Sequence, residues 1–297
     1  MKLFGIINVN KPKGFTSHDV VSKLRKILNM KQIGHTGTLD PLATGVLPIA
    51  LGKATKLIQY LESSKSYRAF IKLGIRTDTY DQEGQILETN PVILDIEKIK
   101  LALNEFHGDI TQTPPIYSAV HYKGKRLYEY ARANIKIEDI PERKVNISSI
   151  KLIQILEEDS ENPILVVDID CSSGTYIRSI ASDLGDKLLY GATLYDLIRT
   201  KSGNLTLDTS YNLDEIEESY KNGKINDLLI NPICIINLEC CKIEQNHLEK
   251  IQKGQSIENI ELNGLNEEQK IQLVYDDKLV AIAKIKDKRI FPVNVFI

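Results

Sequence analysis

"GHTGTLDPLATGVLP", residues 34–48, consists of glycine, threonine and small apolar residues around one charged side chain, Asp40. No other residue between Lys31 and Lys53 carries a formal charge at neutral pH. Desolvating an unpaired carboxylate is costly, so a carboxylate in such surroundings is normally protonated or paired. An aspartate before a proline often only caps a turn. The length of the uncharged flanks favours a second interpretation, in which this segment fits closely against a partner and Asp40 has a counter-charge elsewhere.

The overall composition is that of a globular protein with about two domains. The chain has 297 residues, of which 42% are hydrophobic and 26% charged. No apolar run reaches the ~18 residues of a membrane-spanning helix, and the first residues lack a secretory-signal pattern, so we expect a cytoplasmic protein. The four cysteines and five histidines follow no metal-binding spacing, so we also expect reduced thiols and no metal.

The charge is distributed unevenly along the chain. The net charge is −2, but residues 1–70 hold 11 Lys and Arg against 3 acidic residues, a local charge of +8. Residues 204–270 hold 6 basic against 13 acidic residues, a local charge of −7. Such asymmetry is typical of a face that binds a polyanion, although an unevenly charged solvated surface would give the same pattern.

Hydrophobic periodicity predicts an α+β fold in which many strands follow one another. Thr16 or Ser17 is the expected N-cap of the first helix, and Gly108 is expected to close a later one. The predicted helices cover residues 16–30, 53–62, 93–108 and 175–189. The predicted strands include residues 3–11, 65–77, 144–157 and 163–174.

A polar, acidic stretch near residues 214–232 predicts a domain boundary. We expect one domain over residues 1–232 and a small, mostly β domain over residues 237–297. The β segments expected in the small domain are residues 250–257, 270–277 and 278–297.

Two further segments suggest function. In "CSSGTYIRSIASDLG", residues 171–185, a helix follows a Ser-Ser-Gly turn and carries Arg178 in its first turn. The helix dipole disfavours a cation there, so an anionic partner for Arg178 is expected; an ordinary surface arginine or a phosphate site is the alternative. In "SKSYRAF", residues 64–70, Tyr67 lies on a predicted strand between basic residues, where it can be a packing residue or a stacking platform for a base.

Together these segments resemble a known family. "GHTGTLDPLATGVLP", "KSYRAFIKLGIRTDTYDQEG" and "CSSGTYIRSIASDLGDKL" are similar to the motifs of the TruB family of tRNA pseudouridine synthases, and the resemblance covers about residues 3–210. These enzymes make pseudouridine 55 in the T-loop of tRNA. The resemblance implies a mixed, mostly antiparallel sheet of the pseudouridine synthase type, followed by a PUA-like RNA-binding module. It also implies a cytoplasmic monomer that binds the T-arm of tRNA without a cofactor, metal or guide RNA.

The resemblance also implies roles for individual residues. Asp40 matches the catalytic aspartate, Arg178 the arginine that pairs with it, and Tyr67 the tyrosine that stacks on the flipped uracil and is implicated in deprotonating C5. Four further matches concern substrate binding. Tyr176 matches the neighbouring active-site tyrosine, and Leu197 the apolar residue that packs under the base. His35 matches the histidine that enters the T-loop where the flipped base left a gap, and Lys11 with Pro12 the Lys-Pro pair that supports the site.

Two other functions share these motifs. One is a non-catalytic tRNA-binding or tRNA-folding protein that keeps the same scaffold, which the presence of both Asp40 and Arg178 disfavours. The other is the catalytic subunit of a guide-RNA particle, a class that tends to carry basic terminal extensions, and these are absent here.

Overall fold

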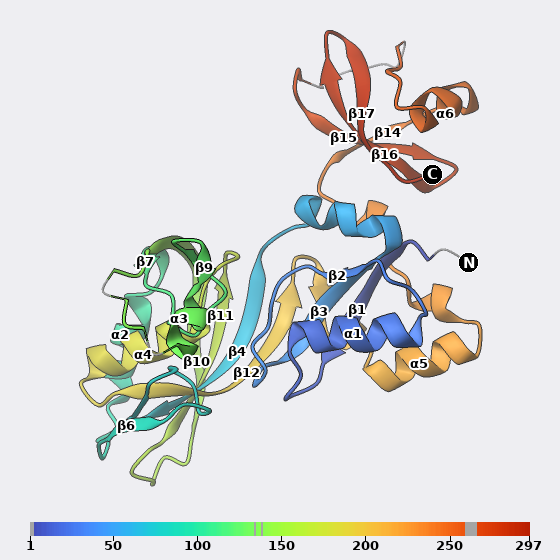
Figure 1. Ribbon diagram of the computed structural model, residues 1–297. Coiled ribbons are helices and arrows are strands. Elements are labelled where there is room, and N and C mark those ends of the chain that lie inside the picture. The colour runs from blue at the N-terminus through green and yellow to red at the C-terminus, as the bar shows by residue number, and fades with distance from the viewer. Residues whose placement is uncertain (1–2, 134, 138, 259–265) are drawn as a thin grey trace.

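A computed structural model describes residues 3–133, 135–137, 139–258 and 266–297. Its main feature is a nine-stranded sheet with the order β1-β3-β12-β4-β11-β10-β7, to which β2 is added beside β3 and β13 beside β12 (Figure 1). All strand pairs of this sheet are antiparallel except β12 with β3, which is parallel. The expected mixed, mostly antiparallel sheet is therefore confirmed. Its strands are β1 (Gly5–Lys11), β2 (Ile33–His35), β3 (Thr44–Leu51), β4 (Lys65–Leu73), β7 (Gly108–Gln112), β10 (Arg143–Leu156), β11 (Ile164–Cys171), β12 (Ala192–Ser202) and β13 (Leu205–Thr206).

Helices cover both halves of this sheet. Helices α1 and α5 contact the half that holds β1 and β2, and α2 and α4 contact the half that holds β10 and β12 (Figure 1). Thr16 caps α1, as predicted: its side chain accepts from the Asp19 amide. The helices are α1 (Ser17–Ile27), α2 (Ile96–Asn104), α3 (Leu127–Arg132), α4 (Ile177–Leu188) and α5 (Leu213–Lys221). Two small hairpins are formed by β5 (Ile75–Thr77) with β6 (Ile86–Thr89) and by β8 (His121–Tyr122) with β9 (Lys125–Arg126).

The C-terminal part forms a separate sheet with the order β14-β15-β16-β17. It has its own apolar core, which includes Ile251, Leu273 and Ile285. A small, mostly β C-terminal domain is therefore present, as predicted. Its elements are β14 (Glu239–Lys242), α6 (Gln245–Gln252), β15 (Lys270–Tyr275), β16 (Lys278–Lys286) and β17 (Arg289–Val295).

The short helix predicted over residues 53–62 is present as the 3₁₀ helix η1 (Gly52–Tyr60), whose buried Ala54 and Leu57 lie three residues apart. Two other local predictions were wrong. The helix predicted over 93–108 ends at Asn104, and Gly108 begins β7 instead of capping it. Residues 250–252, predicted as part of a β segment, belong to helix α6, which buries Ile251.

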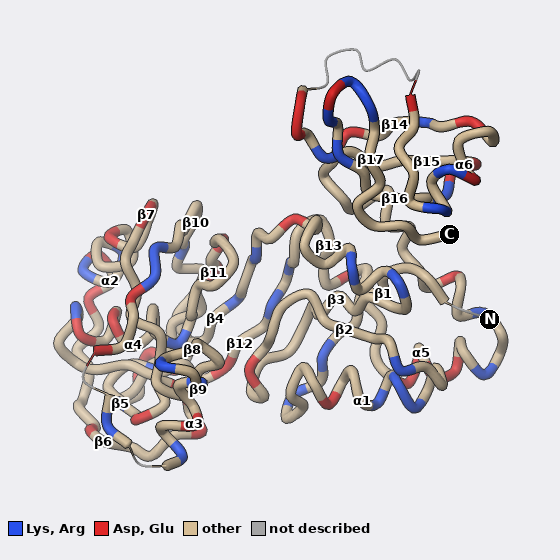
Figure 2. Tube along the Cα trace, turned by 45° about the horizontal axis from the view of Figure 1, so that its top comes forward, with Lys and Arg blue, Asp and Glu red and all other residues tan. Residues whose placement is uncertain are grey.

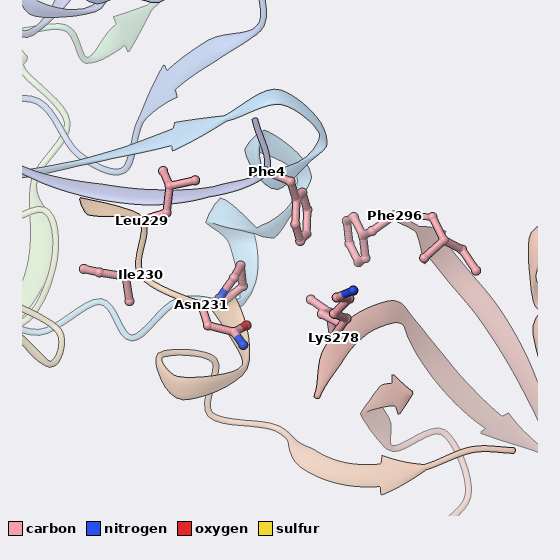
Figure 3. Close-up of a pocket in the computed structure, with 9 residues that line it drawn as sticks. Phe4, Leu229, Ile230, Asn231, Lys278 and Phe296 are labelled. Carbon is pink, nitrogen blue, oxygen red and sulfur yellow. The ribbon is translucent and has the colours of Figure 1, made fainter. Parts of the chain in front are cut away.

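The two sheets meet across a shared apolar cluster. Ile6 of β1 and Leu57 of η1 pack in one cluster with residues of the C-terminal part. These are Leu279 and Ile282 of β16 and Phe296 after β17. Three 3₁₀ turns lead toward this contact: η2 (Leu207–Thr209), η3 (Ile225–Leu228) and η4 (Pro232–Cys234). A pocket opens at its edge, where Phe4, Leu229 and Asn231 face Lys278 and Phe296 (Figure 3). None of the residues that line it is one of the predicted site residues, so the candidate active site lies elsewhere.

Candidate active site

Asp40 lies in the connection between β2 and β3, and its carboxylate is paired with Arg178 of α4. Nε of Arg178 lies 2.9 Å from Asp40 Oδ2, and Nη2 donates to Asp40 Oδ1 at 3.1 Å. This two-point contact consists of one hydrogen bond and one close charge contact, since Nε makes no hydrogen bond among the described residues. A planar guanidinium that reaches both oxygens restricts the orientation of a carboxylate as well as pairing its charge. The Arg178 side chain is 5% exposed and that of Asp40 is 32% exposed. The carboxylate is therefore held from behind by a buried cation while it still faces solvent.

The first turn of α4 is held by Gln112, which ends β7. The Tyr176 amide donates to Gln112 Oε1 at 2.7 Å, and Gln112 Nε2 donates to the Tyr176 carbonyl at 2.9 Å. The side chain of Tyr176 makes no capping hydrogen bond, and the buried Gln112 instead fixes the backbone at the start of the helix. Arg178 is the second residue of the helix, a position that the helix dipole disfavours for a cation. Its acidic partners offset this cost.

Asp81 is a second carboxylate on Arg178 that the sequence did not reveal. Its Oδ2 lies 3.4 Å from Arg178 Nη1, and its side chain is 7% exposed. Burial raises the pKa of Asp81, while hydrogen bonding from Thr79 and the charge of Arg178 oppose the rise. Arg178 also donates to the carbonyls of Thr79 and Tyr117 at 3.3 and 3.0 Å. In the sequence, Asp81 follows Asp78 in a polar turn, and nothing there distinguishes it from a turn-capping residue.

Tyr67 and Leu197 come from the two central strands of the sheet. In the antiparallel pair β4–β12, Tyr67 is opposite Arg199 and Leu197 is opposite Ala69. Residues opposite each other across a strand pair share a face of the sheet, and Tyr67 and Ala69, two positions apart on β4, also share one. Tyr67 is 8% exposed and Leu197 is 4% exposed. Burial raises the pKa of Tyr67, and the nearby Arg199 cation opposes that rise.

Lys11 and Pro12 lie at the end of β1, next to the segment that carries Asp40. Lys11 is fully buried, and its Nζ donates to the carbonyls of Pro12, Phe15 and Pro41 at 3.0, 2.5 and 3.2 Å. Burial lowers the pKa of Lys11 to about 8, and the charge of Asp40 opposes this shift. Lys11 therefore ties the turn after β1 to the residue that follows Asp40.

His35 ends β2, opposite Ile49 of β3. Its Nδ1 is buried without a hydrogen-bond partner among the described residues, as is Oγ1 of the neighbouring Thr36. Burial lowers the pKa of His35, so the neutral imidazole is favoured at neutral pH. The structure thus places His35 on the segment that leads to Asp40 and leaves one ring nitrogen unsatisfied.

The described part of the chain holds no group of three or more His, Cys, Asp or Glu side chains that could bind a metal. The helices within the same residues include none that is long and apolar enough to cross a membrane. The structure therefore holds the Asp40 carboxylate, about one third exposed, on a buried arginine, and Tyr67 and Leu197 come from the central strands.

Comparisons with known proteins identify the family. Residues 25–177 match the family described as TruB family pseudouridylate synthase (N terminal domain). The chain is 46% identical to tRNA pseudouridine synthase B of Bacillus subtilis, over 75% of this chain and 73% of the relative. It is 41% identical to tRNA pseudouridine synthase B of Caldanaerobacter subterraneus over 98% of this chain and 100% of the relative.

The fold is also found in solved structures. The crystal structure of a Cbf5-Nop10-Gar1 complex contains a chain that is similar with a TM-score of 0.73 and 26% identity, over 99% of this chain and 84% of that chain. The extent of these matches shows that the chain belongs to the TruB family of pseudouridylate synthases and is a pseudouridine synthase.

Proposed function

We propose that the protein converts uridine 55 in the T-loop of tRNA into pseudouridine. The observation that carries this proposal is the two-point contact between Asp40 and the buried Arg178, made while the carboxylate still faces solvent. The relatives' names, tRNA pseudouridine synthase B, support tRNA as the substrate.

The reaction breaks the N1–C1′ bond of a uridine and forms a C5–C1′ bond. C5 loses its proton and N1 gains one, so there is no loss of a group and no change of oxidation state. It therefore needs a nucleophile or an ion-pair stabiliser, a base for C5 and a pocket that retains the detached uracil. Arg178 pairs with the carboxylate of Asp40, which acts on C1′, on C6 or on a sugar proton. Tyr67 stacks on the uracil and takes the C5 proton. No step uses a metal or a cofactor.

The uridine reaches this site by flipping out of the T-loop, which costs a few kcal/mol of stacking. His35 fills the gap that the base leaves. Tyr176 and Leu197 line the base pocket. Lys11 and Pro12 support the pocket through the hydrogen bond from Lys11 to the Pro41 carbonyl.

We further propose that the division at residues 232–237 separates a catalytic domain from a PUA-like RNA-binding domain. The separate core of the C-terminal sheet supports this division. The protein acts as a monomer in the cytoplasm, on the T-arm stem-loop, and the C-terminal domain adds contact area without chemistry.

The test is to incubate the purified protein with unmodified tRNA, without guide RNA, and to map pseudouridine by position. The proposal expects conversion at position 55 in a T-loop. Conversion that requires an added guide RNA would assign the protein to the class of catalytic subunits in guide-RNA particles. Tight tRNA binding without any conversion would make it a non-catalytic RNA-binding protein.

A further inference from the structure

Arg199 is the largest side chain that is fully buried in the described part of the chain. It is 1% exposed and lies on β12, two residues after Leu197. No carboxylate of the described residues lies within 4.0 Å of its guanidinium. A buried cation without an acidic partner is costly and needs polar contacts that satisfy its donors, so its partners indicate what it does.

The guanidinium binds both sides of the segment that carries Asp40. Nη2 donates to the Gly37 carbonyl at 3.3 Å and Nη1 to the Thr38 carbonyl at 3.4 Å, both just before Asp40. Nε donates to the Val46 carbonyl at 2.6 Å, six residues after Asp40. One side chain thus ties the two ends of the Asp40 segment to the strand that carries Leu197.

Arg199 also lies opposite Tyr67 in the β4–β12 pair, and both side chains are buried. The other titratable groups around Tyr67 are Asp40 from the loop and Cys171 of β11. Lys65 lies two residues before Tyr67 on β4. Burial raises the pKa of the Cys171 thiol to about 11, so that group is neutral under ordinary conditions. Arg199 is therefore the cation that faces Tyr67 from the neighbouring strand.

We propose that Arg199 is a positioning residue of the active site, which fixes the Asp40 segment against β12 and places an uncompensated positive charge opposite Tyr67. The inference rests on the roles of Asp40 and Tyr67 in the proposed function. Nothing in it requires Arg199 to touch the substrate. Burial raises the pKa of Tyr67 and Arg199 opposes the rise, so loss of the charge moves that pKa further up.

The test compares Arg199→Met and Arg199→Lys with a matched control, Arg68→Gln. Arg68 lies on β4 next to Tyr67 but points to the other face, where it pairs with Asp168 on the surface. The substrate is a T-arm stem-loop with tritium at C5 of its uridines. Tritium release in a single turnover, measured across the pH range in which the protein stays folded, reports the chemical step. Stem-loop affinity and thermal unfolding are measured in parallel.

Arg199→Met is expected to slow the single turnover by about 100-fold, because misplacement of a catalytic group by ~1 Å costs that much. Its affinity for the stem-loop should stay within about threefold of wild type, since phosphate contacts are kept. Its rate should also continue to rise with pH where the wild-type rate has levelled off. Arg199→Lys keeps the charge without the fork, so its rate falls while its pH dependence stays close to that of wild type.

A rate for Arg199→Met within about twofold of Arg68→Gln would overturn the inference, as would a slower rate with an unshifted pH dependence. If Arg199→Met does not fold, Arg199→Lys decides: a loss of about tenfold supports the inference and a loss of less than about twofold overturns it. Wild type and Asp40→Asn are measured first. The proposed function is refuted if wild type releases no tritium or if Asp40→Asn releases it as fast as wild type. If wild type is active and Asp40→Asn is not, the Arg199 measurement is an independent test of the positioning role.

Discussion

Arg178 shows how much of this site depends on a single side chain. It contacts the carboxylates of Asp40 and Asp81 and donates to two backbone carbonyls, all from a position that is 5% exposed. Removing one partner of a buried ion pair typically costs about 3–5 kcal/mol, because the remaining charge is left uncompensated. Arg178 therefore contributes to the fold as well as to the orientation of Asp40.

The substitution Arg178→Lys separates these two contributions. Lysine keeps the charge but loses the planar fork, so we expect the variant to fold and its single-turnover rate to fall by about 100-fold or more. Arg76→Lys is the matched control, since Arg76 also contacts two carboxylates, Glu88 and Asp186, but at the surface. A normal rate for Arg178→Lys would remove Arg178 from its assigned role.

Lys65 leads to a prediction about pH. Burial lowers the pKa of Lys65 to about 8 from its ordinary value of 10.5. The unfolded chain therefore binds the proton more tightly than the folded chain, and stability rises as the pH passes from about 8 toward 10.5. Between about pH 7.5 and 9.5 this contributes roughly 2 kcal/mol.

The measurement is denaturant unfolding of wild type and Lys65→Met at both pH values. The stability of wild type relative to Lys65→Met should increase by roughly 2 kcal/mol over this interval. The exposed Lys201→Met serves as the control, and the stability of wild type relative to Lys201→Met should change little over the same interval. An equally small change in the stability of wild type relative to Lys65→Met would mean that Lys65 is not perturbed by burial.

At the residue scale, the sequence predicted the groups that lie in distinctive local patterns. The isolation of Asp40 and the helix-terminal position of Arg178 each predicted a partner of opposite charge, and the structure pairs the two residues with each other. Asp81 and Arg199 could not be found in this way. Their neighbours in the sequence are ordinary turn and strand residues, and only the three-dimensional contacts give these two residues their significance.

At the scale of elements, the critical contact is the approach of β3 to β12. Gly45 has a φ of +101°, and a Cβ at this position would lie 2.3 Å from the Arg199 carbonyl oxygen. The parallel pairing of Arg199 with Gly45 brings these backbones together. Only glycine permits both the backbone angle and the close approach.

Gly45→Ala is accordingly expected to destabilise the protein by more than about 2 kcal/mol and to slow catalysis, because β3 must move away from β12. Gly14→Ala is the control: Gly14 also has a positive φ, +82°, but nothing lies within 4 Å of its added Cβ. Unfolding and single-turnover rates of both variants separate the steric contact from backbone strain. Equal effects of the two substitutions would argue against a tight β3–β12 contact.

The elements that the sequence predicted correctly are those with a strong periodicity, such as α1, β4 and β11, and α1 also has a clear cap. In η1 the two buried residues lie three positions apart, so the pattern predicted a helix there but not its 3₁₀ geometry. The errors arose where the period is weak. In α6 only Ile251 is fully buried, so the helical period is weak.

At the scale of the whole molecule, fewer Lys and Arg side chains of the N-terminal region are free to bind phosphate than the charge count of the sequence suggested. Of the Lys and Arg in residues 3–70, Lys11 and Lys65 are buried, and three others are paired with carboxylates. Five are exposed and have no acidic side chain within 4.0 Å among the described residues; they lie on α1, η1 and the loop between α1 and β2 (Figure 2). These five are Arg25, Lys26, Lys31, Lys53 and Lys56.

The basic end of the small sheet is also partly neutralised by its own domain. Lys284 pairs with Glu268, Arg289 pairs with Glu258, and the Glu267 carboxylate accepts from the amides of the β16–β17 turn. Charge that is already paired contributes little to phosphate binding. The composition could not show this, because a count of charges says nothing about which of them are paired.

The central claim is that Asp40, held by Arg178, carries out the isomerisation, and one measurement tests it most directly. Asp40→Asn and wild type are compared on a T-arm stem-loop labelled with tritium at C5, with tritium release and stem-loop affinity measured on the same preparations. We predict that the variant releases no tritium above background while its affinity stays within about tenfold of wild type, because the reactive carboxylate is lost and the phosphate contacts are kept. Tritium release by Asp40→Asn at a rate near that of wild type would contradict the account.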